Sequence, residues 1–202
     1  MLLFIFVILS GCSTNVLGNV SVSDEGNQYV KEYAPNPQVP DDRTLEKVGQ
    51  NHLDEKGEVT LKAINNVNKT YQIGEIELTI VDAKKIHLTP DYSLIDYFNN
   101  LTYKEQFEFV KVFVEITNTS NDPIKFAPVA MMETSTGEEI PWENDIYLEN
   151  LNGEIGGNET KYGNVGFIIE NTDIDSFEIT TSAVFDNNDK EMSKEKKIEI
   201  VF

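Results

Sequence analysis

The sequence predicts an all-β protein, an antiparallel β-sandwich of about eight or nine strands with one short helix. Two observations predict this class. After residue 57, apolar and polar residues alternate with a period of two in most segments, as they do in strands with one buried face. After residue 117, turn-forming residues recur about every dozen residues, which limits each segment to a short strand.

The clearest strand lies at residues 107–120 (FEFVKVFVEITNTS), and we expect it to be central in the sheet. Lys111 and Glu115 lie on the face opposite its inward set, and changing either to Ala should cost little stability if that face meets water. Phe113 is the deciding position, because it is either covered by another element or forms an exposed apolar patch with Phe109. The inward set consists of Val110, Val112, Val114 and Ile116.

Two alternating runs precede this strand, at residues 58–63 and 76–88. In the second run, Asp82 and Lys84 have the same parity as the apolar residues and would point into the core. We therefore expect a bulge or a strand break near residues 82–85, after which Ile86 and Leu88 resume the apolar face.

The short helix is expected at residues 89–101, with Thr89 as a cap and Pro90 in the first turn. It should lie across an open edge or end of the sandwich, where it could cover Phe109 and Phe113. Its apolar side is formed by Leu94, Ile95, Phe98 and Leu101.

Further short strands follow the central strand, and residues 134–137 have the composition of a hairpin turn. Residues 153–158 are expected to form a loop, because they contain three glycines. The remaining strands are expected at residues 124–127, 130–133, 139–142, 146–151, 165–169, 177–183 and 198–202.

The first nine residues are almost wholly apolar, and the last of them begins the tetrapeptide Leu-Ser-Gly-Cys at 9–12, which resembles the bacterial lipobox. A membrane-spanning helix needs about 18 apolar residues, so this run is too short to be one. We expect signal cleavage between Gly11 and Cys12 and acylation of Cys12, for example with palmitate. Unlike a standard signal, the run has no preceding Lys or Arg. Cys12 is the only cysteine, which excludes an intramolecular disulfide and a Cys-rich zinc site.

The segment that follows is polar, contains three prolines, and has no sustained apolar period. It should therefore be a flexible tether, with at most a helical turn or two at residues 43–53. We expect three parts: a lipoprotein signal peptide at residues 1–11, the lipidated cysteine and tether at 12–57, and the sandwich domain at 58–202.

Acidic residues outnumber basic ones by 35 to 16, which gives a net charge of −19. This balance argues against nucleic acid as a partner, because phosphate binding needs clustered Lys and Arg. Asp186, Asn188 and Asp189 are weak candidates for calcium, since their segment lacks the glycine and the final glutamate of an EF-hand loop. An Asx-rich turn is the simpler interpretation, so no metal site and no cofactor are expected.

Nothing in the sequence singles out a catalytic acid, base or nucleophile, so we expect no enzyme activity. A partner surface is expected around the short helix, because amphipathic aromatic residues are favoured at interfaces. The alternative is that these aromatic residues only cover the sheet. The candidates for the partner surface are Tyr92, Tyr97, Tyr103, Phe109 and Phe113.

Three segments carry a resemblance to a known family: VKVFVEITNTSNDPIKF at 110–126, ETSTGEEI at 133–140 and TKYGNVGFII at 160–169. Residues 58–202 resemble the immunoglobulin-like "telokin-like" domains of unknown function found in secreted lipoproteins of Gram-positive bacteria. The resemblance implies an immunoglobulin-like β-sandwich and no settled activity. The Cys-Trp-Cys arrangement of antibody domains is absent, because Trp142 has no cysteine pair.

We therefore expect an extracellular lipoprotein, lipid-anchored to the cell membrane and facing outside. It should be a non-catalytic binding or interaction module of the bacterial cell envelope. Its expected partners are the membrane, through the N-terminal lipid, and an unidentified protein or envelope component. The alternative is a cell-envelope enzyme or an accessory subunit of one, which a deep pocket with convergent acidic and histidine side chains would favour.

Overall fold

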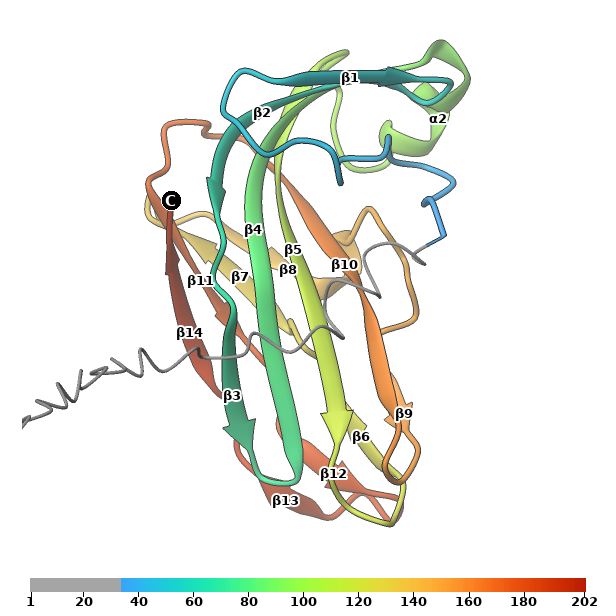
Figure 1. Cartoon of the computed structure of the whole chain (residues 1–202), viewed down its shortest axis with the longest axis vertical. Coiled ribbons are helices and arrows are strands. Elements are labelled where there is room, and N and C mark those ends of the chain that lie inside the picture. The colour runs from blue at the N-terminus through green and yellow to red at the C-terminus, as the bar shows by residue number, and fades with distance from the viewer. Residues whose placement is uncertain (1–33) are drawn as a thin grey trace, which may run out of the picture.

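The computed structural model describes residues 34–202. The predicted signal peptide, the cleavage and lipidation positions Gly11 and Cys12, and tether residues 13–33 therefore lie outside the described residues. The described chain confirms the all-β class: fourteen antiparallel strands accompany one short α-helix (Figure 1). More strands are present than the sequence predicted, because residues 51–54 of the predicted tether, residues 69–73, and residues 153–155 of an expected loop all form strands.

The strands are β1 (Asn51–Asp54), β2 (Gly57–Asn65), β3 (Lys69–Ile73), β4 (Ile76–Pro90), β5 (Phe107–Asn118), β6 (Ile124–Phe126), β7 (Met131–Thr134), β8 (Glu139–Pro141), β9 (Gly153–Ile155), β10 (Thr160–Ile169), β11 (Ser176–Thr180), β12 (Val184–Asp186), β13 (Glu191–Ser193) and β14 (Lys197–Val201). The helical elements are the 3-10 helices η1 (Tyr92–Leu94) and η2 (Trp142–Asn144) and the α-helix α2 (Ile95–Phe98).

The strands form one large and two small sheets. The large sheet has the order β1-β2-β4-β5-β10, with β3 also paired to β4. The small sheets have the orders β14-β11-β7-β8 and β13-β12-β6-β9, and both lie behind the large sheet in Figure 1. This arrangement is a sandwich in which β5, the predicted central strand, pairs with β4 on one side and β10 on the other.

A β-bulge interrupts β4, as the sequence predicted. The register between β4 and β5 shifts between Ile80 and Asp82, so one extra residue enters β4 there. Because side chains alternate between faces, the extra residue moves every later side chain of one parity to the other face. The expectation that Ile86 and Leu88 return to the face of Ile80 is therefore wrong: they belong to a separate hydrophobic cluster.

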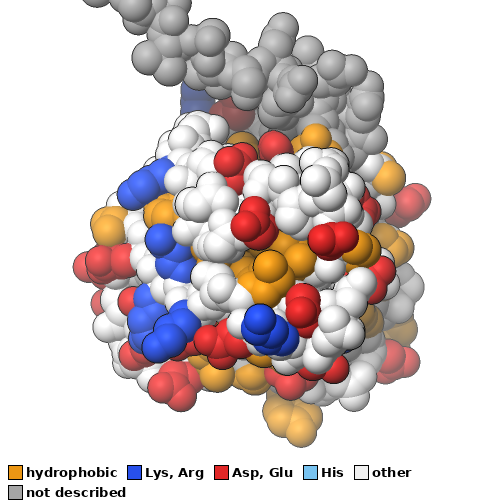
Figure 2. Space-filling model, turned by 90° about the horizontal axis from the view of Figure 1, so that it is seen from below, with side chains coloured by type: hydrophobic (Ala, Val, Ile, Leu, Met, Phe, Trp, Pro, Cys, Tyr) orange, Lys and Arg blue, Asp and Glu red, His pale blue; other side chains and the backbone are white. Residues whose placement is uncertain are grey.

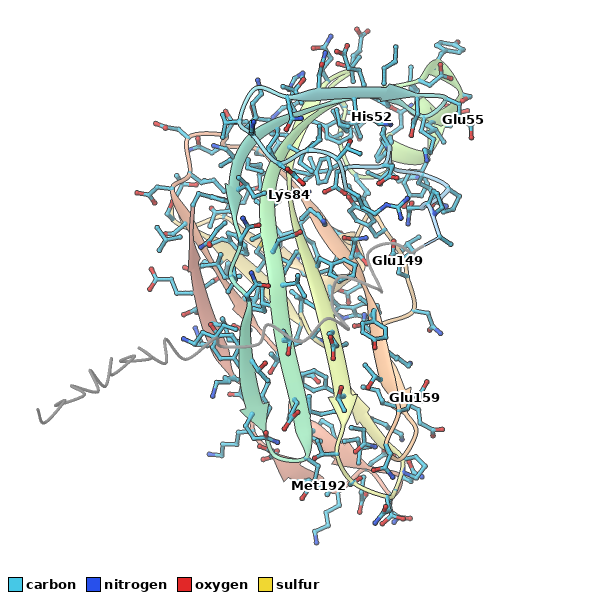
Figure 3. The ribbon with its side chains drawn as sticks, in the orientation of Figure 1. His52, Glu55, Lys84, Glu149, Glu159 and Met192 are labelled. Atoms are coloured by element: carbon cyan, nitrogen blue, oxygen red, sulfur yellow. The ribbon has the colours of Figure 1, made fainter. Side chains whose placement is uncertain are left out.

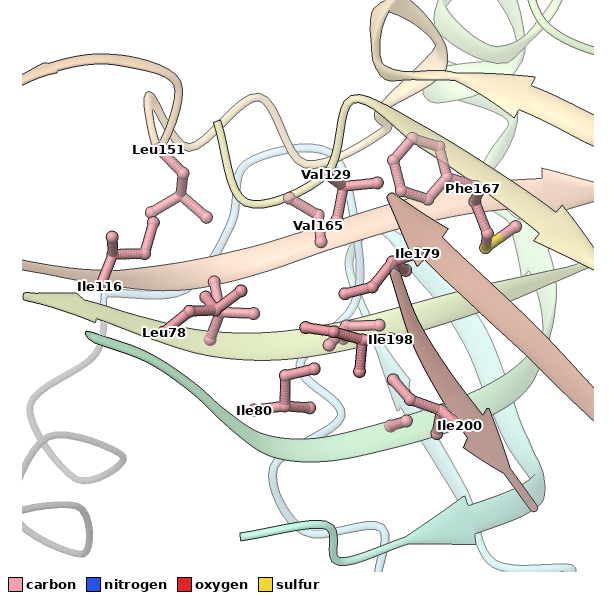
Figure 4. Packing of buried hydrophobic residues seen from close by; sticks show 14 of the residues in the cluster. Leu78, Ile80, Ile116, Val129, Leu151, Val165, Phe167, Ile179, Ile198 and Ile200 are labelled. Atoms are coloured by element: carbon pink, nitrogen blue, oxygen red, sulfur yellow. The ribbon is translucent and has the colours of Figure 1, made fainter. Parts of the chain in front are cut away.

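The inner core fills the space between the large sheet and the two small sheets (Figure 4). The four inward residues of β5 all belong to it, which confirms their predicted direction. Leu78 of β4 and Phe167 of β10 are buried in the same cluster, on the strands that flank β5. The small sheets contribute Ile179, Ile198 and Ile200.

The outer core lies on the opposite face of the large sheet. It combines Ile86 and Leu88 of β4 with Phe107 and Phe109 of β5. Elements from three other parts of the chain cover these residues: Val39 and Leu45 from residues 34–50, Phe98 from α2, and Ile146 and Tyr147 from the connection between β8 and β9. Part of the large sheet is therefore buried on both faces.

Residues 34–50, here called the strap, are part of the folded body. Val39 and Leu45 are buried in the outer core, and β1 pairs with β2. The predicted tether is therefore wrong from residue 36 to residue 57. The low hydrophobicity of this segment is misleading, because a few well-placed apolar residues and one buried carboxylate attach it to the sheet.

The strap is held by a buried ion cluster. Oδ2 of Asp42 lies 2.9 Å from Lys84 Nζ and 3.0 Å from Lys111 Nζ, and Lys111 Nζ lies 3.2 Å from Oδ1 of Asp82. Lys111 is only 2% exposed, so the face of β5 on which it lies does not meet water at this position. The strap buries this part of the sheet surface, and a buried charged side chain is stable only when an opposite charge is paired with it.

The electrostatics of Asp42 follow from this pairing. Burial alone would raise the pKa of its carboxyl group, but the charges of Lys111 and Lys84 and their hydrogen bonds outweigh burial and lower the pKa to about 2. Burial likewise opposes the charged form of Lys111, and Asp42 and Asp82 outweigh it, so the pKa of Lys111 is raised.

The predicted helix is present but shorter. It begins with η1, whose cap is Asp91 rather than Thr89, because Oδ1 of Asp91 accepts a hydrogen bond from Ser93 N at 2.9 Å. Phe98 packs on Phe107, with ring centroids 5.0 Å apart. Phe113 lies elsewhere, between Asp82 and Asn164 on the neighbouring strands.

Two local expectations for the second half of the chain need correction. Residues 146–151 form no strand, because Leu148 and Asn150 adopt positive φ angles of 54°. Residues 153–155, expected in a loop, form β9 and pair with β6. The predicted hairpin around residues 134–137 is confirmed by the pairing of β7 with β8.

Within residues 34–202, no helix has the length and apolar character needed to cross a membrane.

We expect Asp42→Asn to lower the free energy of unfolding at pH 7 by about 3 kcal/mol, because two buried lysines would lose a shared counter-charge. The native carboxyl has a depressed pKa, so its contribution is present above about pH 4 and is lost as the pH falls to about 2. Denaturant melts at pH 7 and in acid should show that the free energies of unfolding of the variant and the wild type differ at pH 7 and converge as the pH falls toward about 2. Glu178→Gln, which breaks the exposed pair with Lys197, should cost less than about 1 kcal/mol.

We expect Leu45→Ala to cost roughly 3 kcal/mol in the same melts, because it removes a fully buried side chain that joins the strap to the outer core. Val48→Ala is the matched control on the same segment, since Val48 is exposed and should be nearly neutral. Equal costs at both positions would contradict the docking of the strap.

Candidate functional site

The connection between β8 and β9, residues 142–152, lies along β10 at the edge of the large sheet, and we call it the edge loop. Two glycines of β10 allow the close approach. A Cβ atom at Gly163 would lie 2.6 Å from Glu149 Oε2, and one at Gly166 would lie 2.6 Å from the ring of Tyr147. Glycine within a strand commonly marks such a contact, so these two positions fix where the loop can rest.

Carboxylates of the edge loop satisfy the outward N–H groups of β10. Asn164 N donates to Glu149 Oε2 at 2.7 Å, and Gly166 N donates to Asp145 Oδ1 at 2.8 Å. Farther along the chain, Glu170 N donates to Glu138 at 3.0 Å. Side chains therefore supply acceptors that a neighbouring strand would otherwise provide at this edge.

Asp145 is the first charged group of the loop. Its carboxylate also accepts hydrogen bonds from the backbone N–H groups of Tyr147 and Leu148 at 3.1 and 3.2 Å. Burial raises the pKa of Asp145, and the three N–H groups only partly oppose that effect. Its hydrogen bonds hold the chain reversal that places Ile146 and Tyr147 in the outer core.

Glu149 is the second charged group, and it lies beside β10 in Figure 3. Burial raises its pKa to about 7, against the opposing effect of hydrogen bonds from Asn164. The strap also reaches it, because Asn36 Nδ2 donates to Glu149 Oε1 at 3.0 Å and to the carbonyl of Tyr147 at 2.8 Å. Glu149 therefore connects the strap, the edge loop and β10.

The loop and β10 enclose a pocket of about 250 Å³. Trp142 and Leu148 lie at its exposed side, with 49% and 62% of their surface accessible. The apolar part of the lining consists of Trp142, Leu148, Leu151 and Val165. The polar part consists of Glu143, Asp145, Glu149, Asn150 and Asn152.

Two features distinguish this pocket from a simple surface depression. Leu148 has a left-handed backbone, which is unfavourable for a residue with a branched side chain, and it presents that side chain to solvent. Within residues 34–202, the buried Oδ1 atom of Asn152 accepts no hydrogen bond. A strained exposed leucine and a buried acceptor without a donor are features common at binding sites.

A second hollow, of about 550 Å³, lies at the lower end of the molecule. Figure 2 shows apolar side chains gathered on this end, with acidic and basic side chains around them. Pro123, Ile124 and Met192 line the hollow together with Asp122 and Asp186. Glu75 and Asp122 are exposed, and Asp186 serves a turn, so this hollow offers weaker grounds for a binding site than the pocket at β10.

The predicted partner surface is only partly exposed. Tyr92 and Tyr103 are 87% and 98% accessible and lie on either side of α2. Tyr97 is half-buried, and its hydroxyl donates to the carbonyl of Ile146 at 2.8 Å. Phe109 is fully buried and Phe113 is 6% exposed, so the expectation that they contribute to a surface is wrong.

The weak calcium candidates form a turn. Oδ1 of Asp186 accepts hydrogen bonds from Asn188 N at 2.8 Å and Lys190 N at 2.9 Å, and Asp189 pairs with Lys125 at 2.6 Å. Elsewhere too, the part of the chain that the structure describes contains no group of three or more His, Cys, Asp or Glu side chains placed to hold a metal ion.

Sequence reasoning did not identify the pocket at β10. The strongest indication of this pocket in the sequence is the pair Gly163 and Gly166 within a strand, because glycine inside a strand often marks the close approach of another segment. The carboxylates Asp145 and Glu149 could not be selected by type alone, since the chain has 35 acidic residues.

We expect the stability of the protein to fall as the pH rises from about 5 to about 8. The raised pKa of Glu149 means that the folded state holds a proton that the unfolded state has released, so its favourable contribution is lost as the pH passes about 7. Thermal melts across this range should show a smaller fall for Glu149→Gln than for the wild type. Glu154→Gln, at an exposed position outside the pocket, should show the same dependence of stability on pH as the wild type. A fall in stability in Glu149→Gln as large as in the wild type would contradict the raised pKa of Glu149 as its cause.

Comparison with known proteins gives two curated relatives, both from Bacillus subtilis (strain 168). The uncharacterized protein YdhF is 47% identical over 225 residues, which covers 97% of this chain and 95% of that protein. The SPbeta prophage-derived uncharacterized lipoprotein YonS is 26% identical over 160 residues, covering 77% of this chain and 71% of that protein.

A solved structure supports the fold. The crystal structure of a functionally unknown protein from Listeria monocytogenes EGD-e matches with a TM-score of 0.51 at 13% identity, covering 72% of this chain and 88% of that one. The model of one family matches residues 65–191, which include the strands from β3 to β12 and the whole edge loop. The chain therefore belongs to the family described as "Domain of unknown function (DUF4352)".

Proposed function

We propose that this protein is an extracytoplasmic lipoprotein, anchored in the cell membrane through Cys12, whose immunoglobulin-like, telokin-like domain is a non-catalytic binding module. The Leu-Ser-Gly-Cys segment after an apolar run supports the anchor, and so does the name of one relative as a lipoprotein. The pocket between the edge loop and β10 supports the binding role and is the proposed ligand site.

The observation that carries the binding role is the combination of groups in this pocket. Apolar side chains and hydrogen-bond acceptors line the same small concavity, which is the composition typical of ligand sites. Leu148 and Asn152 both line it, the first with a strained backbone and an exposed side chain, and the second with a buried oxygen that accepts no hydrogen bond within residues 34–202. Backbone strain and an unsatisfied acceptor cost stability, so a ligand that covers one and donates to the other would offset both.

Binding is favoured over the alternative of an envelope enzyme by the positions of the two carboxylates. Asp145 and Glu149 accept hydrogen bonds from backbone N–H groups of β10, so they serve to position the loop. Hydrolysis needs an acid and a base directed at one reacting centre. The lining of the pocket within residues 34–202 contains carboxylates and no histidine, which does not match the constellation expected for that alternative.

The anchor is tested by metabolic labelling with a palmitate analogue in the native host. Wild-type protein should incorporate the label and sediment with membranes, whereas Cys12→Ser should do neither, because no other cysteine is present. Equal labelling of the two proteins would contradict the anchor.

The binding role is tested on the folded chain by NMR with a panel of small amines, alcohols and carboxylic acids. Hits should perturb the amide signals of the edge loop and should be weakened by Leu148→Ala. Leu53→Ala is the matched control, because Leu53 is also an exposed leucine but does not line the pocket. A panel without any hit at the edge loop would contradict this role.

A further inference from the structure

We propose that the pocket between the edge loop and β10 binds a small organic cation, an ammonium or guanidinium group attached to a compact apolar body. This inference rests on the proposed binding role and specifies its ligand class. It follows from the kinds of group that line the pocket, from the space they leave, and from the connections of Glu149.

The charged groups of the lining are all of one sign. Within residues 34–202, its ionisable members are the carboxylic acids Glu143, Asp145 and Glu149. The buried Oδ1 atom of Asn152 adds a further acceptor that lacks a donor in the same part of the chain. A ligand that fits these groups must donate hydrogen bonds and carry positive charge.

The opposite part of the lining selects an apolar body. Trp142, Leu148 and Leu151 present carbon surface to the same pocket. An indole ring also attracts cations held over its face, so Trp142 can serve both parts of such a ligand. The volume of about 250 Å³ lies just below the range of about 300–1,000 Å³ that is usual for drug-sized ligands. The ligand should therefore be small.

Anionic and neutral ligands fit less well. An anion would face three acidic side chains of the pocket and the net charge of −19 of the whole chain. A neutral alcohol could donate to Asn152 but would gain nothing from the carboxylates. The nearest basic group on β10 is Lys161, and its Nζ donates to the carbonyl of Asn150 at 3.4 Å, on the loop itself.

Glu149 makes binding dependent on pH. Within residues 34–202, the groups placed near it include Asp145 and Glu143 on its own loop, Asn36 on the strap and Asn164 on β10, while Lys161 of β10 bonds to the same loop at Asn150. Burial raises the pKa of its carboxyl group to about 7. A bound cation favours the carboxylate, so binding should release a proton and should strengthen as the pH rises through that value.

The test uses the single tryptophan of the chain as its reporter, because Trp142 lines the pocket. The full chain is titrated with phenethylamine, with the neutral phenethyl alcohol and with the acid hydrocinnamate, and Trp142 fluorescence is followed. The amine should bind at least about tenfold more tightly than the alcohol, and the acid should bind most weakly. The affinity for the amine should be higher at pH 8 than at pH 6.

Glu149→Gln should reduce the affinity for phenethylamine about tenfold, remove most of its dependence on pH, and leave the affinity for phenethyl alcohol within about twofold. Glu143→Gln is a second variant, at an exposed lining position, and should weaken amine binding by a smaller factor even if Glu149→Gln folds poorly. Glu154→Gln makes the same charge change outside the pocket and should alter neither affinity.

The ligand class would be overturned if the alcohol or the acid bound at Trp142 as tightly as the amine, or if both glutamine variants kept the wild-type preference. Such results would leave the binding role intact. Failure of all three probes to change Trp142 fluorescence or the NMR signals of the edge loop would instead overturn the binding role together with this inference.

Discussion

The bulge in β4 is the constraint on which the rest of the structure depends. Without the extra residue between Ile80 and Asp82, the isoleucines and leucines of β4 would share one face, and Asp82 and Lys84 would enter the inner core. With it, the first half of β4 supplies the inner core and the second half supplies the outer core. One strand can thus support two hydrophobic layers on opposite faces of the sheet.

The second layer explains the strap. Ile86, Leu88 and Phe109 on the outer face would lose part of their cover if only the sandwich domain predicted from the sequence were folded, because Val39 and Leu45 of the strap belong to the same cluster. Covering that face also buries Lys84 and Lys111, and Asp42 of the strap supplies their counter-charge. The apolar and the ionic contacts of the strap therefore depend on each other, because a buried lysine without a partner would destabilise the docked segment.

The sequence predicted the parts of the fold that depend on local periodicity. The alternation in residues 110–116 is strong enough to place β5 and its inward face, and the conflict at Asp82 is enough to place the bulge. The strap could not be predicted in this way, because its attachment depends on a few residues without any period. Lys111 shows the same limit of prediction from periodicity. The alternation tells which face of β5 its side chain is on, but the burial of that face depends on the strap, whose Asp42 pairs with Lys111.

The candidate site was even harder to predict from the sequence, because its groups come from three separate segments: the edge loop, β10 and the strap.

The attachment of the strap near this site has a mechanical consequence. A force applied at residue 34 is transmitted to the rest of residues 34–202 first at Asn36 and Asp42. These residues bond to the edge loop and, through Lys84 and Lys111, to the central strands β4 and β5. The load therefore enters the middle of the large sheet before it reaches β1, the edge strand that would peel away most easily.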